Sequence, residues 1–231
     1  AIGGVAVGLL FKDLPAVLLL PMVLLASVIV GAIWGLIPGW LLYRFHTNEI
    51  LSTVLLNFVA FGLVNYICTD VWGAPDAGHP TTNPIGAGGY LPLLIKNPPL
   101  HDGIFIAIVI AAAVYIYTNR TTAGYDLVAT GSNPRAAAVY GINVRVMFVL
   151  GMVLAGALAG LAGGIEVAGV QHRLIEGMHS NFKVLGIIIG LIAQGSSLAV
   201  PFVAFFIAVL EVGASAMQRT MNIPVEMVFI V

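Results

Sequence analysis

The sequence predicts an all-α fold, a polytopic transmembrane helical bundle. Three observations predict this class: 60% of the residues are hydrophobic, only 8% are charged, and several uncharged windows are as long as a membrane-spanning helix. Nine Lys and Arg against ten Asp and Glu in 231 residues give a net charge of −1, whereas about a quarter of the residues in a soluble domain are charged. This composition excludes a soluble enzyme, a disordered tail and a basic nucleic-acid-binding surface.

The charged residues divide the chain into candidate spans. A helix crosses the hydrocarbon core with about 20 apolar residues. Four uncharged windows each fit one crossing: residues 14–43, 50–69, 103–119 and 146–165. A fifth window, 184–210, is interrupted by Gly195 and Pro201, so we expect a short element near 182–194, re-entrant or complete, and a full span near 198–217. In total we expect about six spans.

Three uncharged segments are not assigned as complete spans. Residues 77–95 are rich in Pro, Gly and Thr, which is typical of a loop. Residues 1–11 resemble the end of an apolar span, and residues 224–231 resemble the start of another. We therefore expect this chain to be part of a longer protein.

Basic residues predict the orientation. Segment 119–145 carries three Arg against one Asp, whereas segment 73–102 carries one Lys against two Asp. The positive-inside rule then places 119–145 in the cytoplasm and the Pro- and Gly-rich loop outside. Arg44 and residues 195–197 also fall on the inside in this topology.

An internal repeat relates two halves of a single transmembrane domain over residues 1–231. The pattern Gly-Ala-x-x-Gly-Leu-x-x-Gly occurs at 31–39 and again at 156–164, an offset of 125. Three crossings separate the copies, which predicts inverted repeats over about 15–118 and 146–231, an architecture in which transporters place their pathway between the halves. The spacing favours close helix approach, either as generic small-residue packing or as part of the repeat, for Gly31, Gly35, Gly39, Gly156, Gly160 and Gly164.

Polar residues follow the first copy. Glu49, Thr53 and Asn57 lie four residues apart, with Ser52 beside them, so they share one face of an otherwise apolar helix. Either Thr47 or Asn48 caps the helix, Glu49 favours its positive end and the other residues bond to neighbouring helices, or these residues line a path for a polar solute. Two acids at or near membrane depth are candidates for proton coupling: Glu166 and Glu211.

The segment between the halves predicts a short helix outside the membrane. Ser132 or Asn133 can cap it, Pro134 suits its first position, and Gly141 ends it. The helix has an Ala-rich face. It is either a surface turn or a contact for a cytosolic partner.

These residues together resemble permease subunits of bacterial ATP-binding-cassette importers, in the group that serves branched-chain amino acids, ribose-type sugars and nucleosides. Within that group the chain is most similar to nucleoside and simple-sugar permeases that work with a basic-membrane-protein-type binding lipoprotein. Departures from the usual family pattern occur near 183–187 and 194–197. The similarity rests on residues 36–39, 47–58, 131–144, 156–164, 172–174 and 216–220.

The resemblance implies roles for the short helix and for two segments, residues 48–57 and 182–194. It implies that the short helix couples the permease to an ATPase subunit through Asn133, Pro134, Arg135, Ala136, Ala137, Gly141 and Ile142. It also implies that the solute pathway is flanked by Asn48, Glu49, Ser52, Thr53, Asn57, Phe182 and Lys183. The expected partners are the cytosolic ATPase, a second identical or similar permease subunit and an extracytoplasmic solute-binding lipoprotein, with no nucleic acid.

We therefore expect a multi-pass subunit of the cytoplasmic (inner) membrane that imports nucleosides or related sugar-like solutes. The sequence has no GxxxxGK[ST] phosphate loop, no HExxH motif and a single cysteine, Cys68. Catalytic residues, metal ligands and cofactors are accordingly not assigned to this chain, and ATP and Mg are expected in the partner. The alternative is a proton-coupled secondary transporter that uses Glu166 or Glu211; a membrane scaffold without transport is a third hypothesis.

Overall fold

The computed structural model describes residues 1–74, 78–95, 100–178 and 180–221. These residues are mostly helical, which confirms the predicted all-α class. The helices are α1 (Ile2–Leu10), α2 (Ala16–Phe45), α3 (Glu49–Tyr66), α4 (Gly103–Arg120), α5 (Thr122–Ser132), α6 (Pro134–Val139), α7 (Val144–Glu166), α8 (Ser180–Ile192) and α9 (Ala199–Met221).

Short elements complete the fold. The π-helical turns η1 (Ile67–Val71) and η3 (Val167–Gln171) extend α3 and α7, and η2 (Ala87–Gly89) is a single 3-10 turn. A two-stranded antiparallel sheet is formed by β1 (Leu93–Ile95) and β2 (Leu100–His101).

Among the described residues, four helices are long and apolar enough to cross a membrane. They are Ala16–Phe45, Glu49–Val71, Gly103–Arg120 and Val144–Gln171, in agreement with the four predicted windows. A shorter apolar stretch, Ala199–Ala214, lies in α9. The fifth window is divided as predicted, into the 13-residue α8 and the longer α9. A count of six spans stays a prediction, and the expected helix start at 224–231 lies outside the described residues.

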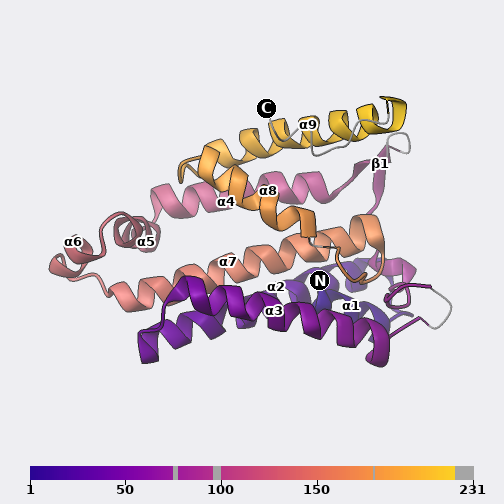
Figure 1. Cartoon of the computed structure of the whole chain (residues 1–231), viewed down its shortest axis with the longest axis horizontal. Helices are drawn as coiled ribbons and strands as arrows, with labels where there is room; N and C mark the ends of the chain where they lie inside the picture. Colours follow the sequence, from indigo (N-terminus) through magenta and orange to yellow (C-terminus); the bar gives the residue numbers. More distant parts are fainter. Residues whose placement is uncertain (75–77, 96–99, 179, 222–231) are drawn as a thin grey trace.

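The two ends of the bundle differ in structure. Figure 1 shows α5 and α6 projecting at one end, together with the α2–α3 and α8–α9 turns, and the sheet at the opposite end. Arg44, Arg120, Arg135 and Arg145 belong to helices or turns at the α5–α6 end. The predicted cytoplasmic segments therefore lie at one end, called the inner end below, and the other end is called the outer end.

The contact between α2 and α7 forms the centre of the bundle. The two glycine stripes face each other and the helices run antiparallel, because successive residues of α2 meet earlier residues of α7. A β-carbon added at Gly31 would lie 2.8 Å from the Cα of Gly160, and one added at Gly156 would lie 3.0 Å from the Cα of Gly35. No side chain fits between backbones this close, so any path between the halves runs beside this contact and not through it.

The α2–α7 contacts are also reciprocal. Gly31 meets Gly160, which is the repeat counterpart of Gly35, and Gly35 meets Gly156, which is the counterpart of Gly31. Likewise Gly39 contacts Val149, while Leu24, the position equivalent to Val149, contacts Gly164. An exchange of this kind is expected when a local two-fold axis relates two helices, as in an inverted repeat.

The Pro- and Gly-rich loop is a cap on the outer end and does not span the membrane. The backbone N–H of Thr82 donates to the carbonyl of Leu174 (2.9 Å), and the N–H of Leu174 donates to the Thr82 hydroxyl (3.0 Å). Ile85 and Leu174 are buried with residues of α1, η1 and η3 in one apolar cluster. The loop assignment is therefore confirmed for the described part of 77–95.

His172 joins the cap to the end of η3. Its carbonyl accepts the N–H of Ile85 (2.9 Å) and its ring stacks on Tyr90, with ring centroids 3.9 Å apart. Burial lowers the pKa of His172 below its ordinary value, and the positive charge of Arg173 lowers it further. The contact between the cap and η3 is therefore more stable when the His172 ring is uncharged.

Substitution of Gly31 by Ala tests the α2–α7 contact. The added methyl group meets backbone atoms of α7, so overpacking should cost about 1–3 kcal/mol, measured as a lower Tm of the full-length protein in detergent. The matched control is Gly62→Ala on α3, where a β-carbon meets no atom within 4 Å. This control should raise or preserve the Tm because Ala favours helices over Gly by about 1 kcal/mol. Equal Tm values for both variants would contradict the contact.

Candidate functional site

The predicted coupling segment folds as the sequence suggests. The Asn133 side chain caps α6 by accepting the backbone N–H of Ala136 (3.1 Å), and Pro134 occupies the first helical position. At the other end the N–H of Ile142 donates to the carbonyl of Ala137, and that of Gly141 donates to the carbonyl of Ala138, both at 3.1 Å. With Gly141 at φ +85°, these bonds form a Schellman motif, which fixes where α6 stops.

The two faces of α6 differ in exposure. Ala137 is only 3% exposed, whereas Val139 and Tyr140 are each 86% exposed. The guanidinium-bearing Arg135 is also exposed. A groove of about 380 Å³ lies beside the helix and is lined by Tyr125, Asp126, Ala129, Asn133, Ala136, Ala137, Tyr140 and Ile142.

This arrangement suits the binding of another protein. The aliphatic Val139 and the C-cap residue Tyr140 project from a small helix that is buried on its own chain at Ala137. Tyr and Arg are enriched among the residues that dominate protein–protein affinity. The sequence did not distinguish Val139 and Tyr140, because their exposure depends on how α6 is seated.

The polar residues at the start of α3 mostly satisfy one another. Asn48 is the N-cap and accepts the N–H groups of Ile50 (2.9 Å) and Leu51 (3.3 Å). The Ser52 hydroxyl donates to the Asn48 carbonyl, and the Thr53 hydroxyl donates to the Glu49 carbonyl. Within this chain, these polar side chains therefore cap α3 or bond to its backbone.

Asn57 differs from that group because its side chain is exposed in the middle of the helix. No residue of α3 is buried within this chain. An exposed amide at membrane depth is costly in hydrocarbon. The face that carries Asn57 therefore requires a polar surrounding or a partner that covers it.

The second predicted pathway segment lies on α8. Phe182 is 54% exposed at the start of this helix, and the side chain of Lys183 is outside the described part of the structure. In Figure 1, α3 and α8 lie on opposite sides of α7. This single chain therefore does not bring the two predicted pathway segments together.

Three acidic side chains have different surroundings in the structure. Glu166 accepts a hydrogen bond from the Gln171 amide (3.4 Å), and Glu211 is half-buried in α9. The carboxylate of Glu176 accepts a hydrogen bond from the Asn65 amide, and the backbone N–H of Glu176 donates to the carbonyl of Pro80 (3.2 Å). The sequence did not suggest this bond, since Asn65 and Glu176 are 111 residues apart.

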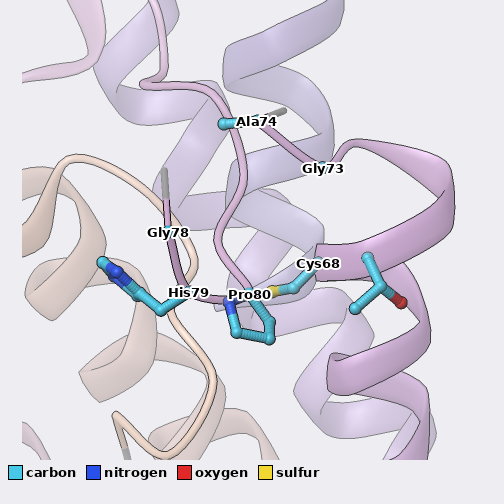
Figure 2. Close-up of a pocket in the computed structure, with 7 residues that line it drawn as sticks. Cys68, Gly73, Ala74, Gly78, His79 and Pro80 are labelled. Atoms are coloured by element: carbon cyan, nitrogen blue, oxygen red, sulfur yellow. The ribbon is translucent and has the colours of Figure 1, made fainter. Parts of the chain in front are cut away.

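A hollow of about 420 Å³ lies at the outer end. Figure 2 shows the side chains of Cys68 and Pro80 close together in it, while the ring of His79 points away from Cys68. Cys68 is 2% exposed, and its thiol lies 3.7 Å from the Leu174 carbonyl. None of the predicted pathway residues lines this hollow, and the described residues contain no group of three or more His, Cys, Asp or Glu that could hold a metal ion.

Substitution of Gly141 by Ala tests how α6 is terminated. The left-handed φ of Gly141 should cost an Ala side chain about 1–2 kcal/mol, which corresponds to roughly tenfold faster amide hydrogen exchange over 134–142. Gly131→Ala is the matched control, because both glycines have open space around them and Gly131 lies within α5. Unchanged exchange in the Gly141 variant would contradict the Schellman assignment.

Comparisons with known proteins agree with the family that the sequence resembles. The family model described as "Branched-chain amino acid transport system / permease component" matches residues 1–231. The glucose ABC transporter permease protein of Haloferax volcanii is 31% identical over 229 residues, which cover 95% of this chain and 60% of that protein. The guanosine ABC transporter permease protein of Bacillus subtilis is 31% identical over 222 residues, covering 95% and 64%, respectively.

A third relative is the nucleoside ABC transporter permease protein of Lactococcus lactis, 30% identical over 230 residues that cover 96% of this chain and 63% of that protein. The chain thus spans less than two thirds of the length of these relatives. No solved structure matches it. With the family model matched over all 231 residues and four helices able to cross a membrane, the chain is a multi-pass integral membrane protein and belongs to the permease components of the branched-chain amino acid transport system family.

Proposed function

We propose that this chain is the membrane-spanning subunit of an ATP-driven importer for nucleosides or related small, sugar-like solutes in the cytoplasmic (inner) membrane. The observation that carries the proposal is α6, a capped extramembrane helix that presents Val139 and Tyr140 away from the bundle. Guanosine, nucleosides and glucose are named for three relatives, which supports the solute class.

In the proposed mechanism, a cytosolic ATPase subunit binds α6 and the groove beside it. ATP and Mg are bound by that partner. When the ATPase closes, it pulls on α6, and the packed Ala137 face transmits the force into the bundle. Tilting of the two repeats then alternates access to the two sides of the membrane.

The exposed Asn57 supports a second permease subunit. An amide at mid-span is stable where a water-filled path or another protein surface covers it. A second copy or a similar subunit facing α3 would enclose such a path, with Asn57 as one of its polar groups. An extracytoplasmic binding lipoprotein would deliver solute to the outer end.

A charge reversal at Arg135 and a truncation at Tyr140 test the docking role of α6. Arg135→Glu and Tyr140→Ala should each weaken binding of the ATPase subunit by about thirtyfold, because interface anchors contribute about 2 kcal/mol or more. The measurement is co-purification of the full-length subunit in mild detergent, with mass spectrometry of what accompanies it.

Gly141→Pro, which removes the N–H that donates to Ala138, should leave ATPase activity but uncouple it from uptake.

Arg145→Glu is the matched control for the docking experiment. Arg145 is exposed on the same segment but lies in the first turn of α7, where a negative charge favours the helix dipole. This variant should retain the ATPase. Retention of the ATPase by the Arg135 and Tyr140 variants as well would overturn the docking role of α6.

The energy source is tested in membrane vesicles supplied with labelled guanosine. At constant ATP, a protonophore should leave uptake unchanged, and Glu211→Gln should have no effect, since the proposal gives this acid no role. Loss of uptake when only the proton gradient is removed would favour the proton-coupled transporter. Glu166→Gln, which keeps an acceptor for Gln171, should also leave uptake unchanged, since the proposal gives Glu166 no role in proton coupling.

A further inference from the structure

We propose that Thr118, Asn119 and Ser197 form a joint that transmits movement of α6 to the α8–α9 hairpin. They are positioning residues and have no contact with solute in this inference. The inference rests on the proposed function, since it assigns the route by which an ATPase docked on α6 would move α8.

Hydrogen bonds between side chains make the joint. The hydroxyls of Thr118 and Ser197 lie 3.1 Å apart, and the Asn119 amide donates to the Ser197 hydroxyl (3.4 Å) and to the Thr118 hydroxyl (3.0 Å). Thr118 and Asn119 are in the last turn of α4, whereas Ser197 lies in the turn between α8 and α9. The joint thus connects segments that are 79 residues apart.

The elbow between α4 and α5 is tightly packed. The Thr121 hydroxyl donates to the carbonyl of Tyr117 (2.7 Å) and accepts the N–H of Gly124 (3.0 Å). A β-carbon added at Gly124 would lie 2.8 Å from the Cα of Thr118. Because no space separates the first turn of α5 from the last turn of α4, a displacement of α5 also displaces Thr118.

The connection from α5 to α6 is equally short. Asn133 is the single residue between the two helices; its N–H donates to the carbonyl of Ala129 and its own carbonyl accepts the N–H of Ala137, both at 3.0 Å. A pull on α6 therefore reaches Ser197 through α5, the elbow and the end of α4.

The turn that receives this movement is well defined. The N–H of Ser196 donates to the Ala193 carbonyl (2.9 Å), and Gln194 and Gly195 both have left-handed φ values, 49° and 76°. Among the described elements, the main packing partner of α8 is α9. The bonds from Thr118 and Asn119 therefore tie a hairpin with few other contacts to the coupling segment.

The test uses the complete transporter, with its ATPase and binding protein, in proteoliposomes. Ser197→Ala and the isosteric Thr118→Val should each lower the amount of guanosine imported per ATP hydrolysed by about fivefold, with ATPase binding and activity unchanged. Ser197→Thr, which keeps the hydroxyl, should restore the ratio. Ser196→Ala is the matched control, because the Ser196 hydroxyl accepts only a local bond from the N–H of Ala199 (3.4 Å).

A second readout is independent of the solute. In the wild-type complex, addition of ATP should change amide hydrogen exchange in both α6 and α8. In the Ser197→Ala complex, ATP should change exchange in α6 but not in α8. Exchange in α8 that still responds to ATP in this variant, or an unchanged import ratio, would overturn the joint while leaving the proposed function intact. A wild-type chain that binds no ATPase would instead overturn the proposed function and, with it, this route.

Discussion

The backbone contact between α2 and α7 is the constraint on which the rest of the structure depends. Lipid supplies no hydrophobic force between two apolar helices, so their association depends on close packing. The two glycine stripes allow that packing because backbone faces backbone at Gly31, Gly35, Gly156 and Gly160. Ser27 extends the contact to α1, because it is buried on α2 and lies against Gly4 and Gly164. The bundle is thus organised around residues that contribute almost no side-chain surface.

The two ends of this packed centre are stabilised in different ways. At the outer end, segments far apart in sequence are joined by backbone hydrogen bonds, such as the one from the N–H of Thr82 to the carbonyl of Leu174, and share an apolar cluster. At the inner end, short helices follow one another along the chain, and few side-chain bonds join distant segments. Local stability follows the density of such contacts. The inner end is therefore the more easily displaced, which agrees with a partner acting there.

The sequence predicted what depends on local chemistry. Spans could be located because a charge within hydrocarbon is costly, so the uncharged windows and the helices coincide. The ends of α6 could be predicted because Asn133, Pro134 and Gly141 each suit one backbone position. Contacts such as Asn65–Glu176 and Thr118–Ser197 follow no periodicity, because the fold alone brings these residues together. The repeat indicated the glycine stripes, but their direct contact with each other required the structure.

The reciprocity of the α2–α7 contact bears on how such a protein could arise. Gly31 meets the counterpart of Gly35, and Gly35 meets the counterpart of Gly31. Two identical chains related by a two-fold axis exchange contacts in this same way. A half-length ancestor could have used this stripe to dimerise with its copies in opposite orientations, and gene duplication with fusion would keep that interface. Surfaces away from the axis would then be free to diverge. Residues 134–139 form α6, whereas the equivalent residues 9–14 form the end of α1 and the turn that follows it.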